Sequence, residues 1–121
     1  MSETGKGGNL EELRDALRTF ADARDWNQFH SPKNLAMALS AEAGELLEVF
    51  QWLTEEQSQR LAPESRTAAA EEIADVLLYL IRLADKLGVD PVDAARRKLA
   101  KNAEKYPVDK ARGNARKYTE L

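Results

Sequence analysis

Cysteine is absent from this chain of 121 residues, and histidine occurs once, at His30. Without cysteine the chain has no disulfide bridge, no thiolate nucleophile and no cysteine-based zinc site. A single histidine also excludes a multi-histidine metal centre within one chain. A metal bound here would therefore be held mainly by carboxylate oxygens, which favours Mg²⁺, Mn²⁺ or Ca²⁺.

Long hydrophobic runs are also missing. No stretch approaches the roughly 20 consecutive apolar residues of a membrane-spanning helix, so we expect no membrane partner. The first nine residues lack the apolar core of a signal peptide, and we expect residues 1–9 to form a flexible leader. The length predicts one domain, and we expect a soluble, cytoplasmic protein.

The net charge of the chain is −3, but the charges are unevenly distributed along the sequence. Residues 1–95 hold 9 basic and 18 acidic side chains, whereas residues 96–117 hold 9 basic and 2 acidic. The basic stretch is either a solvated helix end and tail, or a set of cations for a polyanionic substrate or for the acidic body of a neighbouring subunit. Nucleic acid is not expected as a partner, because the acidic remainder of the surface would repel it.

Apolar spacing and helix-terminal residues predict an all-α fold without strands. Ser31-Pro32 and Asp90-Pro91 are typical helix starts, and Gly88 suits the left-handed residue after a helix. The predicted helices span about residues 10–24, 32–52, 63–87 and 91–105. We expect a four-helix bundle domain over residues 10–107, followed by a basic C-terminal tail over residues 108–121.

Two of these helices, 32–52 and 63–87, are apolar on more than one face. A helix of this kind is buried on more than one side. Four short helices cannot cover all of this surface, so we expect a homo-oligomer, with a tetramer favoured over a dimer.

Two pairs of acidic residues on the two most apolar predicted helices are candidates for a shared site. Glu42 interrupts an apolar stripe of the helix over 32–52, and Glu45 follows three residues later. Glu72 and Asp75 repeat this spacing on the helix over 63–87. Four converging carboxylates would repel one another unless their pKa values rise or cations neutralise them. Such pairs also commonly form surface salt bridges, and the spacing alone leaves both interpretations open.

The pattern Glu42-x-x-Glu45 followed by Glu72-x-x-Asp75 resembles the all-α nucleoside triphosphate pyrophosphohydrolases of the MazG-like superfamily. Further motifs resemble its dCTP pyrophosphatase branch and extend the similarity over about residues 10–121. They are Arg24-Asp25-Trp26-x-Gln28-Phe29-His30-x-Pro32-x-Asn34-Leu35, Glu42-x-Gly44-Glu45-Leu46, Phe50-Gln51-Trp52, Glu71-Glu72-x-x-Asp75-Val76-Leu77-x-Tyr79-Leu80, Asn102, Tyr106-Pro107 and Arg116-Lys117-Tyr118-Thr119-Glu120-Leu121. The resemblance implies Mg²⁺-dependent cleavage of dCTP or a modified dCTP to the monophosphate and pyrophosphate, in nucleotide-pool sanitation.

The resemblance also implies roles for individual residues. The matches to the family's Mg²⁺ ligands are Glu42, Glu45, Glu72 and Asp75. Mn²⁺ could also occupy the site that these residues form. The matches to its substrate-contacting positions are Trp26, Asn27, Gln28, Phe29, His30, Trp52 and Tyr79. From the residues alone, the two tryptophans could stack on a base or pack in a core or interface.

A row of polar side chains on one side of the helix over 91–105 includes Lys98 and Asn102, which are candidate contacts of the triphosphate. The alternative is a solvated polar face.

Two departures from the family pattern also bear on function. Ala41 stands where many MazG-like proteins have a further glutamate, and Leu17 stands where animal dCTP pyrophosphatases have a substrate-contacting histidine.

The base preference is therefore left open by the sequence. Two alternatives remain beside a dCTP-directed enzyme. One is a house-cleaning pyrophosphatase with little base preference, and the other is a non-enzymatic helical interaction module whose acidic cluster is structural.

Overall fold

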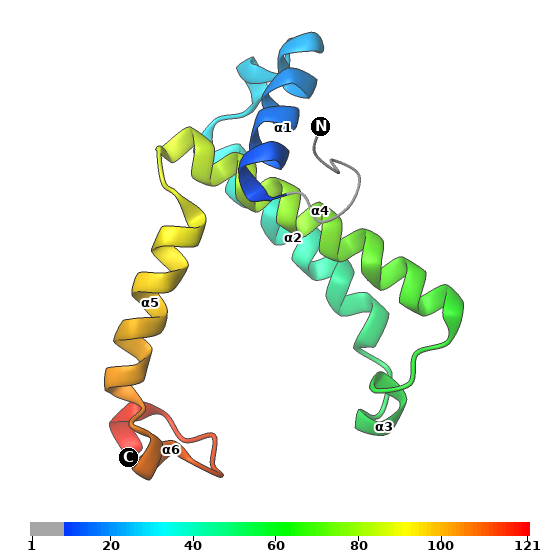
Figure 1. Cartoon of the computed structure of the whole chain (residues 1–121). Coiled ribbons are helices and arrows are strands. Elements are labelled where there is room, and N and C mark those ends of the chain that lie inside the picture. Colours follow the sequence, from blue (N-terminus) through cyan, green and yellow to red (C-terminus); the bar gives the residue numbers. More distant parts are fainter. Residues whose placement is uncertain (1–8) are drawn as a thin grey trace. The chain divides into compact units, whose positions relative to one another are not determined.

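The computed structural model describes residues 9–121, and every regular element in that range is helical (Figure 1). The α-helices are α1 (Leu10–Ala23), α2 (Pro32–Phe50), α3 (Glu55–Ser58), α4 (Pro63–Leu87), α5 (Pro91–Lys105) and α6 (Val108–Ala111). Two 3-10 turns, Asn27–Phe29 and Tyr118–Glu120, complete the set. The all-α prediction is confirmed. The predicted leader lies outside the described residues except for Asn9.

The chain forms two compact units, one ending at Gly88 and the other spanning Val89–Leu121. The expected division into a domain over residues 10–107 and a tail over residues 108–121 stays a prediction. Within residues 9–121, no helix is long and apolar enough to cross a membrane.

Each long helix begins with a side chain that accepts from a free backbone N–H group, with a proline at its first position, or with both. The Asn9 side chain accepts from the Glu12 N–H at 2.9 Å, and Ser31 Oγ accepts from the Asn34 N–H at 3.1 Å. Asp90 caps α5 by accepting from two backbone N–H groups. Gly88 ends α4 with φ at 68°, a left-handed conformation that glycine adopts without a Cβ clash. These caps explain why the four long helices match the sequence prediction to within two residues.

The short helix α3 lies between the predicted helices over 32–52 and 63–87 and was not predicted from the sequence. It is held by a reciprocal pair of hydrogen bonds between Thr54 and Gln57, in which each side chain accepts from the other residue's backbone N–H. A four-residue helix shows no apolar periodicity, and therefore only its capping residues could have indicated it.

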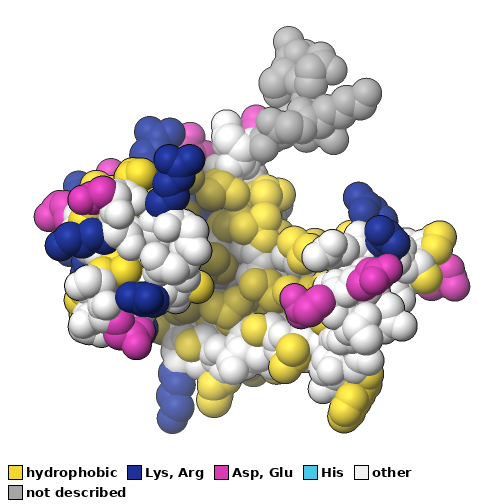
Figure 2. All heavy atoms as spheres, turned by 90° about the horizontal axis from the view of Figure 1, so that it is seen from below, with side chains coloured by type: hydrophobic (Ala, Val, Ile, Leu, Met, Phe, Trp, Pro, Cys, Tyr) yellow, Lys and Arg dark blue, Asp and Glu magenta, His cyan; other side chains and the backbone are white. Residues whose placement is uncertain are grey.

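In the first unit, α2 and α4 run antiparallel along much of their length, and α1 packs against α4 (Figure 1). The core is small and consists of Ala21, Leu35, Ala69, Ile81 and Ala84. Many larger apolar side chains remain exposed, and a broad hydrophobic area is visible in Figure 2. The pairing of α2 with α4 is what brings the two predicted acidic pairs to a common interface.

In the second unit, the C-terminal segment folds against the end of α5. Tyr106 and Tyr118 meet edge to face with ring centroids 6.0 Å apart, and the Lys105 ammonium lies 4.7 Å from the Tyr118 ring centroid. The stretch expected to be a basic tail therefore contains local structure, including α6.

Candidate functional site

The acidic residues of α2 and α4 meet where the two helices pack. One carboxylate oxygen from each of Glu42, Glu45 and Glu72 lies within 4.8 Å of the others. Asp75, one turn after Glu72, adds its negative charge to the same cluster and raises the pKa of Glu42 and Glu72. The packing of two antiparallel helices thus gathers the four predicted acids from two distant parts of the sequence.

Electrostatic repulsion and partial burial dominate this cluster. Burial, contact with Glu45 and the charge of Glu72 raise the pKa of Glu42 to about 7. Burial and the charges of Glu45 and Asp75 also raise the pKa of Glu72. At neutral pH Glu42 is consequently partly protonated, whereas an ordinary glutamate would be ionised.

One oxygen of the cluster has no hydrogen-bond partner. Glu72 Oε2 is buried and unpaired, an arrangement that costs free energy because a desolvated acceptor has lost its water. A cation would both satisfy this oxygen and offset the repulsion between the carboxylates. The donor set contains only carboxylate oxygens, which suits a hard divalent ion. The acidic cluster can therefore bind a divalent metal cation.

The segment between α1 and α2 is pinned at several points. The Trp26 N–H donates to the Ala21 carbonyl at 2.9 Å, and the Trp26 ring meets Phe20 and His30 edge to face. Gln28 Nε2 donates to the Asp25 carboxylate at 3.0 Å. The predicted substrate-contacting residues Trp26–His30 thus form one ordered turn, whose roles stay predictions.

The exposure of the aromatic residues shows whether they pack in the core of this chain. Trp52 is 86% exposed and Phe29 is 58% exposed, so neither packs in the core of this chain. Trp52 is therefore available to a substrate or to another subunit, and core packing within one chain does not explain it. Trp26 is less exposed because it contacts Phe20 and His30.

The remaining predicted contacts lie on α4 and α5. Tyr79 is half-buried, one turn after Asp75 on α4. Lys98 is exposed and Asn102 is half-buried, and both belong to α5 in the second unit. Their roles also stay predictions.

Sequence reasoning missed Arg82, which contacts two of the predicted substrate-binding residues. Its side chain is only 5% exposed and donates to His30 Nδ1 at 3.1 Å and to Asn27 Oδ1. The available signal was an arginine enclosed by apolar residues, Leu80, Ile81 and Leu83, on the helix that also carries two of the acids.

Comparison with known proteins agrees with the helical fold. The model of the MazG-like family matches residues 37–121. The dCTP pyrophosphatase 1 of Mus musculus is 47% identical over 114 residues, covering 93% of this chain and 67% of its own. The human dCTP pyrophosphatase 1 is 46% identical with the same coverage.

A solved structure shows the same fold. The crystal structure of a pyrophosphatase from Archaeoglobus fulgidus superposes with a TM-score of 0.77 at 45% identity, covering 81% of this chain and 92% of that one. The class is therefore that of small all-α pyrophosphohydrolases. The chain belongs to the MazG-like family, as its sequence motifs predicted.

The raised pKa of Glu42 predicts an unusual pH dependence for the metal-free protein. The folded protein takes up a proton at about pH 7, whereas an unfolded chain takes it up near the ordinary value of 4.5. Folding is therefore linked to proton uptake, and Glu42 makes the protein more stable as the pH falls from about 8 to about 5. Glu42→Gln should be more stable than wild type at about pH 8 in EDTA, and this advantage should shrink toward about pH 5.

Thermal melting of both proteins across that pH range measures the difference. Glu71→Gln is a matched control, because Glu71 is an exposed glutamate on α4 that does not belong to the cluster. A constant difference between wild type and Glu42→Gln would show that Glu42 titrates normally.

Proposed function

We propose that this protein is a Mg²⁺-dependent pyrophosphohydrolase that converts dCTP, or a modified dCTP, to the monophosphate and pyrophosphate. The observation that carries the proposal is the carboxylate cluster between α2 and α4, with its raised pKa values and its unpaired Glu72 oxygen. The similarity to dCTP pyrophosphatases over 93% of the chain supports dCTP as the substrate. We place this activity in the cytoplasm, in the sanitation of nucleotide pools.

The residues that would hold the metal are Glu42, Glu45, Glu72 and Asp75. Bound Mg²⁺ would supply Lewis-acid polarisation of the phosphates and a more acidic water, the chemistry that divalent ions bring to phosphate hydrolysis. Mn²⁺ has similar ligand preferences and is expected to substitute. Attack at the α- or the β-phosphorus gives the same two products, so the proposal covers both.

The base requires a separate set of contacts, because metal ligation addresses only the phosphates. We assign this part to Trp26, Trp52 and the turn Asn27–His30, with Tyr79, Lys98 and Asn102 as polar contacts of the sugar and phosphates. The 86% exposure of Trp52 supports this assignment, since an exposed indole face can stack on a base. Leu17 is half-buried on α1, and with no histidine there we expect looser discrimination among bases.

The proposal predicts that neutralising one acid abolishes turnover and leaves the fold intact. Glu45→Gln and Asp75→Asn should each lower kcat by more than about 100-fold, since loss of even an outer partner of a metal site costs about 10–100-fold. Pyrophosphate release from a panel of dCTP, dTTP, dATP and dGTP, with and without Mg²⁺, measures this, and circular dichroism reports the fold. Glu64→Gln is the matched control, because Glu64 lies on α4 with Asp75 but outside the cluster.

The panel also separates the alternatives. Equal rates for all four bases would favour a broad house-cleaning pyrophosphatase. Absence of Mg²⁺-dependent release from any nucleotide would contradict the proposal and favour a helical interaction module.

We expect the Trp52→Ala variant to bind the base more weakly but to bind the metal as wild type does. Removing one base–aromatic stack should lower kcat/KM for dCTP by about 5-fold to 150-fold, the equivalent of about 1–3 kcal/mol. The Mg²⁺ concentration for half-maximal activity should stay unchanged, because the acidic cluster is intact. Identical kcat/KM values for every substrate in wild type and variant would assign Trp52 to packing against another subunit instead.

We also propose that the protein is a homo-oligomer, a tetramer or a dimer. In the part of the first unit that the structure describes, the core consists of five small or medium apolar residues, while larger ones are exposed on α2 and α4. Among these exposed side chains are Met37, Leu47, Ile73, Leu77 and Leu80. Extensive exposed apolar surface commonly marks interfaces between proteins.

Sedimentation should therefore give a species well above the 13.5 kDa of one chain. Met37→Glu, which places a charge on this surface away from the acidic cluster, should shift the species toward the monomer. Gln59→Glu adds the same charge at an exposed polar position and should have no effect. A wild-type monomer at micromolar concentration would contradict the proposal.

A further inference from the structure

The first unit buries one charged side chain among the residues that the structure describes, and it is Arg82 on α4. Its neighbours Ile81 and Ala84 belong to the core. A guanidinium in such surroundings is costly unless its N–H groups find acceptors. The acidic cluster does not supply them, so this arginine has a different task from balancing the metal-site acids.

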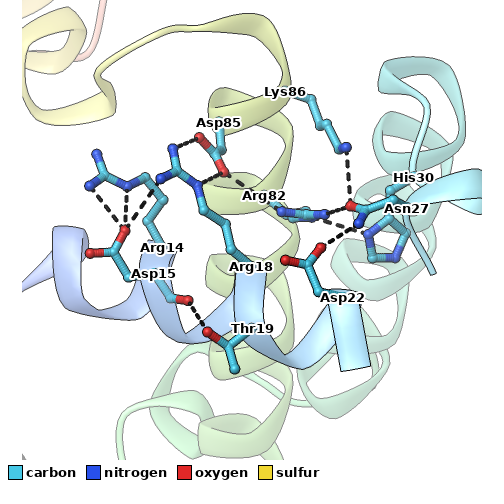
Figure 3. Close-up of polar contacts among 10 residues, drawn as sticks. All are labelled: Arg14, Asp15, Arg18, Thr19, Asp22, Asn27, His30, Arg82, Asp85 and Lys86. Carbon is cyan, nitrogen blue, oxygen red and sulfur yellow. Dashed lines mark hydrogen bonds and ion pairs between the residues drawn. The ribbon is translucent and has the colours of Figure 1, made fainter. Parts of the chain in front are cut away.

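The acceptors of Arg82 lie mainly on the turn between α1 and α2 (Figure 3). Arg82 Nε donates to His30 Nδ1 at 3.1 Å, and Nη2 donates to Asn27 Oδ1. Nη1 faces Asp85 Oδ2 at 3.6 Å. Because the guanidinium is a rigid planar fork, these contacts fix the positions of Asn27 and His30 relative to each other and to α4.

The surrounding contacts hold this arrangement from both sides (Figure 3). Arg18 of α1 binds Asp85 through two hydrogen bonds of 2.8 and 2.6 Å, and this contact holds the pKa of Asp85 below its usual value. Asn27 also donates to Asp22 and accepts from Lys86 Nζ at 3.3 Å. The network therefore joins α1, the turn and α4.

The contact with Arg82 determines which nitrogen of His30 carries the proton. Arginine offers only donors, so His30 Nδ1 has to be the acceptor in the 3.1 Å hydrogen bond. A neutral imidazole with an accepting Nδ1 carries its proton on Nε2. Burial, together with the positive charges of Arg82 and Lys86, lowers the pKa of His30 and keeps the ring neutral. His30 consequently has an N–H donor at Nε2.

We propose that Arg82 is a positioning residue, which locks the turn Asn27–His30 onto α4 and fixes His30 as the tautomer protonated at Nε2. His30 then offers the substrate a hydrogen-bond donor, which selects an acceptor atom such as a carbonyl oxygen or an unprotonated ring nitrogen of a base. The role toward substrate rests on the proposed function, whereas the tautomer is a property of the protein alone.

The chain's single histidine makes the tautomer directly measurable. In tag-free protein labelled with ¹⁵N in the imidazole ring, the nitrogen resonances report one residue. Wild type at neutral pH, without nucleotide, should show a protonated Nε2 and an unprotonated Nδ1. A protonated Nδ1, in either the other tautomer or the imidazolium, would overturn the proposal.

Variants of Arg82 separate positioning from general packing. Arg82→Met keeps a long apolar side chain but removes all donors, so the Nε2–H tautomer should lose its dominance and the pKa of His30 should rise. Arg82→Lys keeps a donor and the charge and should restore the wild-type tautomer in part. Lys86→Met removes a neighbouring positive charge but leaves the bond to Nδ1, and the tautomer should not change.

Kinetics test the substrate part with a different readout. Arg82→Met should raise KM for dCTP by about 10-fold to 100-fold, the range expected when a hydrogen-bonding group becomes mispositioned, while the Mg²⁺ dependence stays that of wild type. Unchanged KM together with an unchanged His30 spectrum in Arg82→Met would overturn the positioning role. If wild type hydrolyses no nucleotide, the proposed function fails, and the spectra alone decide whether Arg82 fixes His30.

Discussion

Where α2 packs against α4, apolar contacts have to hold carboxylates together against their own repulsion. Glu42 and Glu72 are half-buried, their pKa values are raised, and Glu72 Oε2 has no partner. Each of these features costs stability in the metal-free chain, and each is relieved by a cation. The helices supply the rigidity that keeps the acids from moving apart. Because binding of a divalent ion would relieve these costs, the free energy that they take from the metal-free fold would favour metal binding.

The long helices could be predicted because local signals and apolar spacing agree. Ser31, Asp90 and Gly88 mark helix ends through contacts within a few residues, which a sequence displays directly. The acidic pairs were also predictable, since a spacing of three places both members of a pair on neighbouring positions of one helix. The family resemblance contributed the substrate class, which neither composition nor spacing contains.

Arg82 could not be predicted in the same way, because its role depends on contacts between distant residues. Its partners Asn27 and His30 lie 55 and 52 positions earlier in the chain. An arginine on a helix usually extends to solvent, and only the packing of the turn against α4 encloses this one. The exposure of Trp52 is likewise a tertiary property, since an apolar residue at a helix end predicts burial as readily as exposure.

One helix carries both parts of the candidate site. Glu72 and Asp75 lie on α4, and Arg82, which holds the turn Asn27–His30, lies farther along the same helix. With a rise of 1.5 Å per residue, Glu72 and Arg82 are separated by about 15 Å along its axis. A rigid helix, rather than a loop, therefore sets the spacing between the acids proposed to bind the metal and the turn proposed to contact the base. In the proposed function, substitutions on α1 or in the turn, such as leucine at position 17, would then change which base is accepted without disturbing the acids proposed to hold the metal.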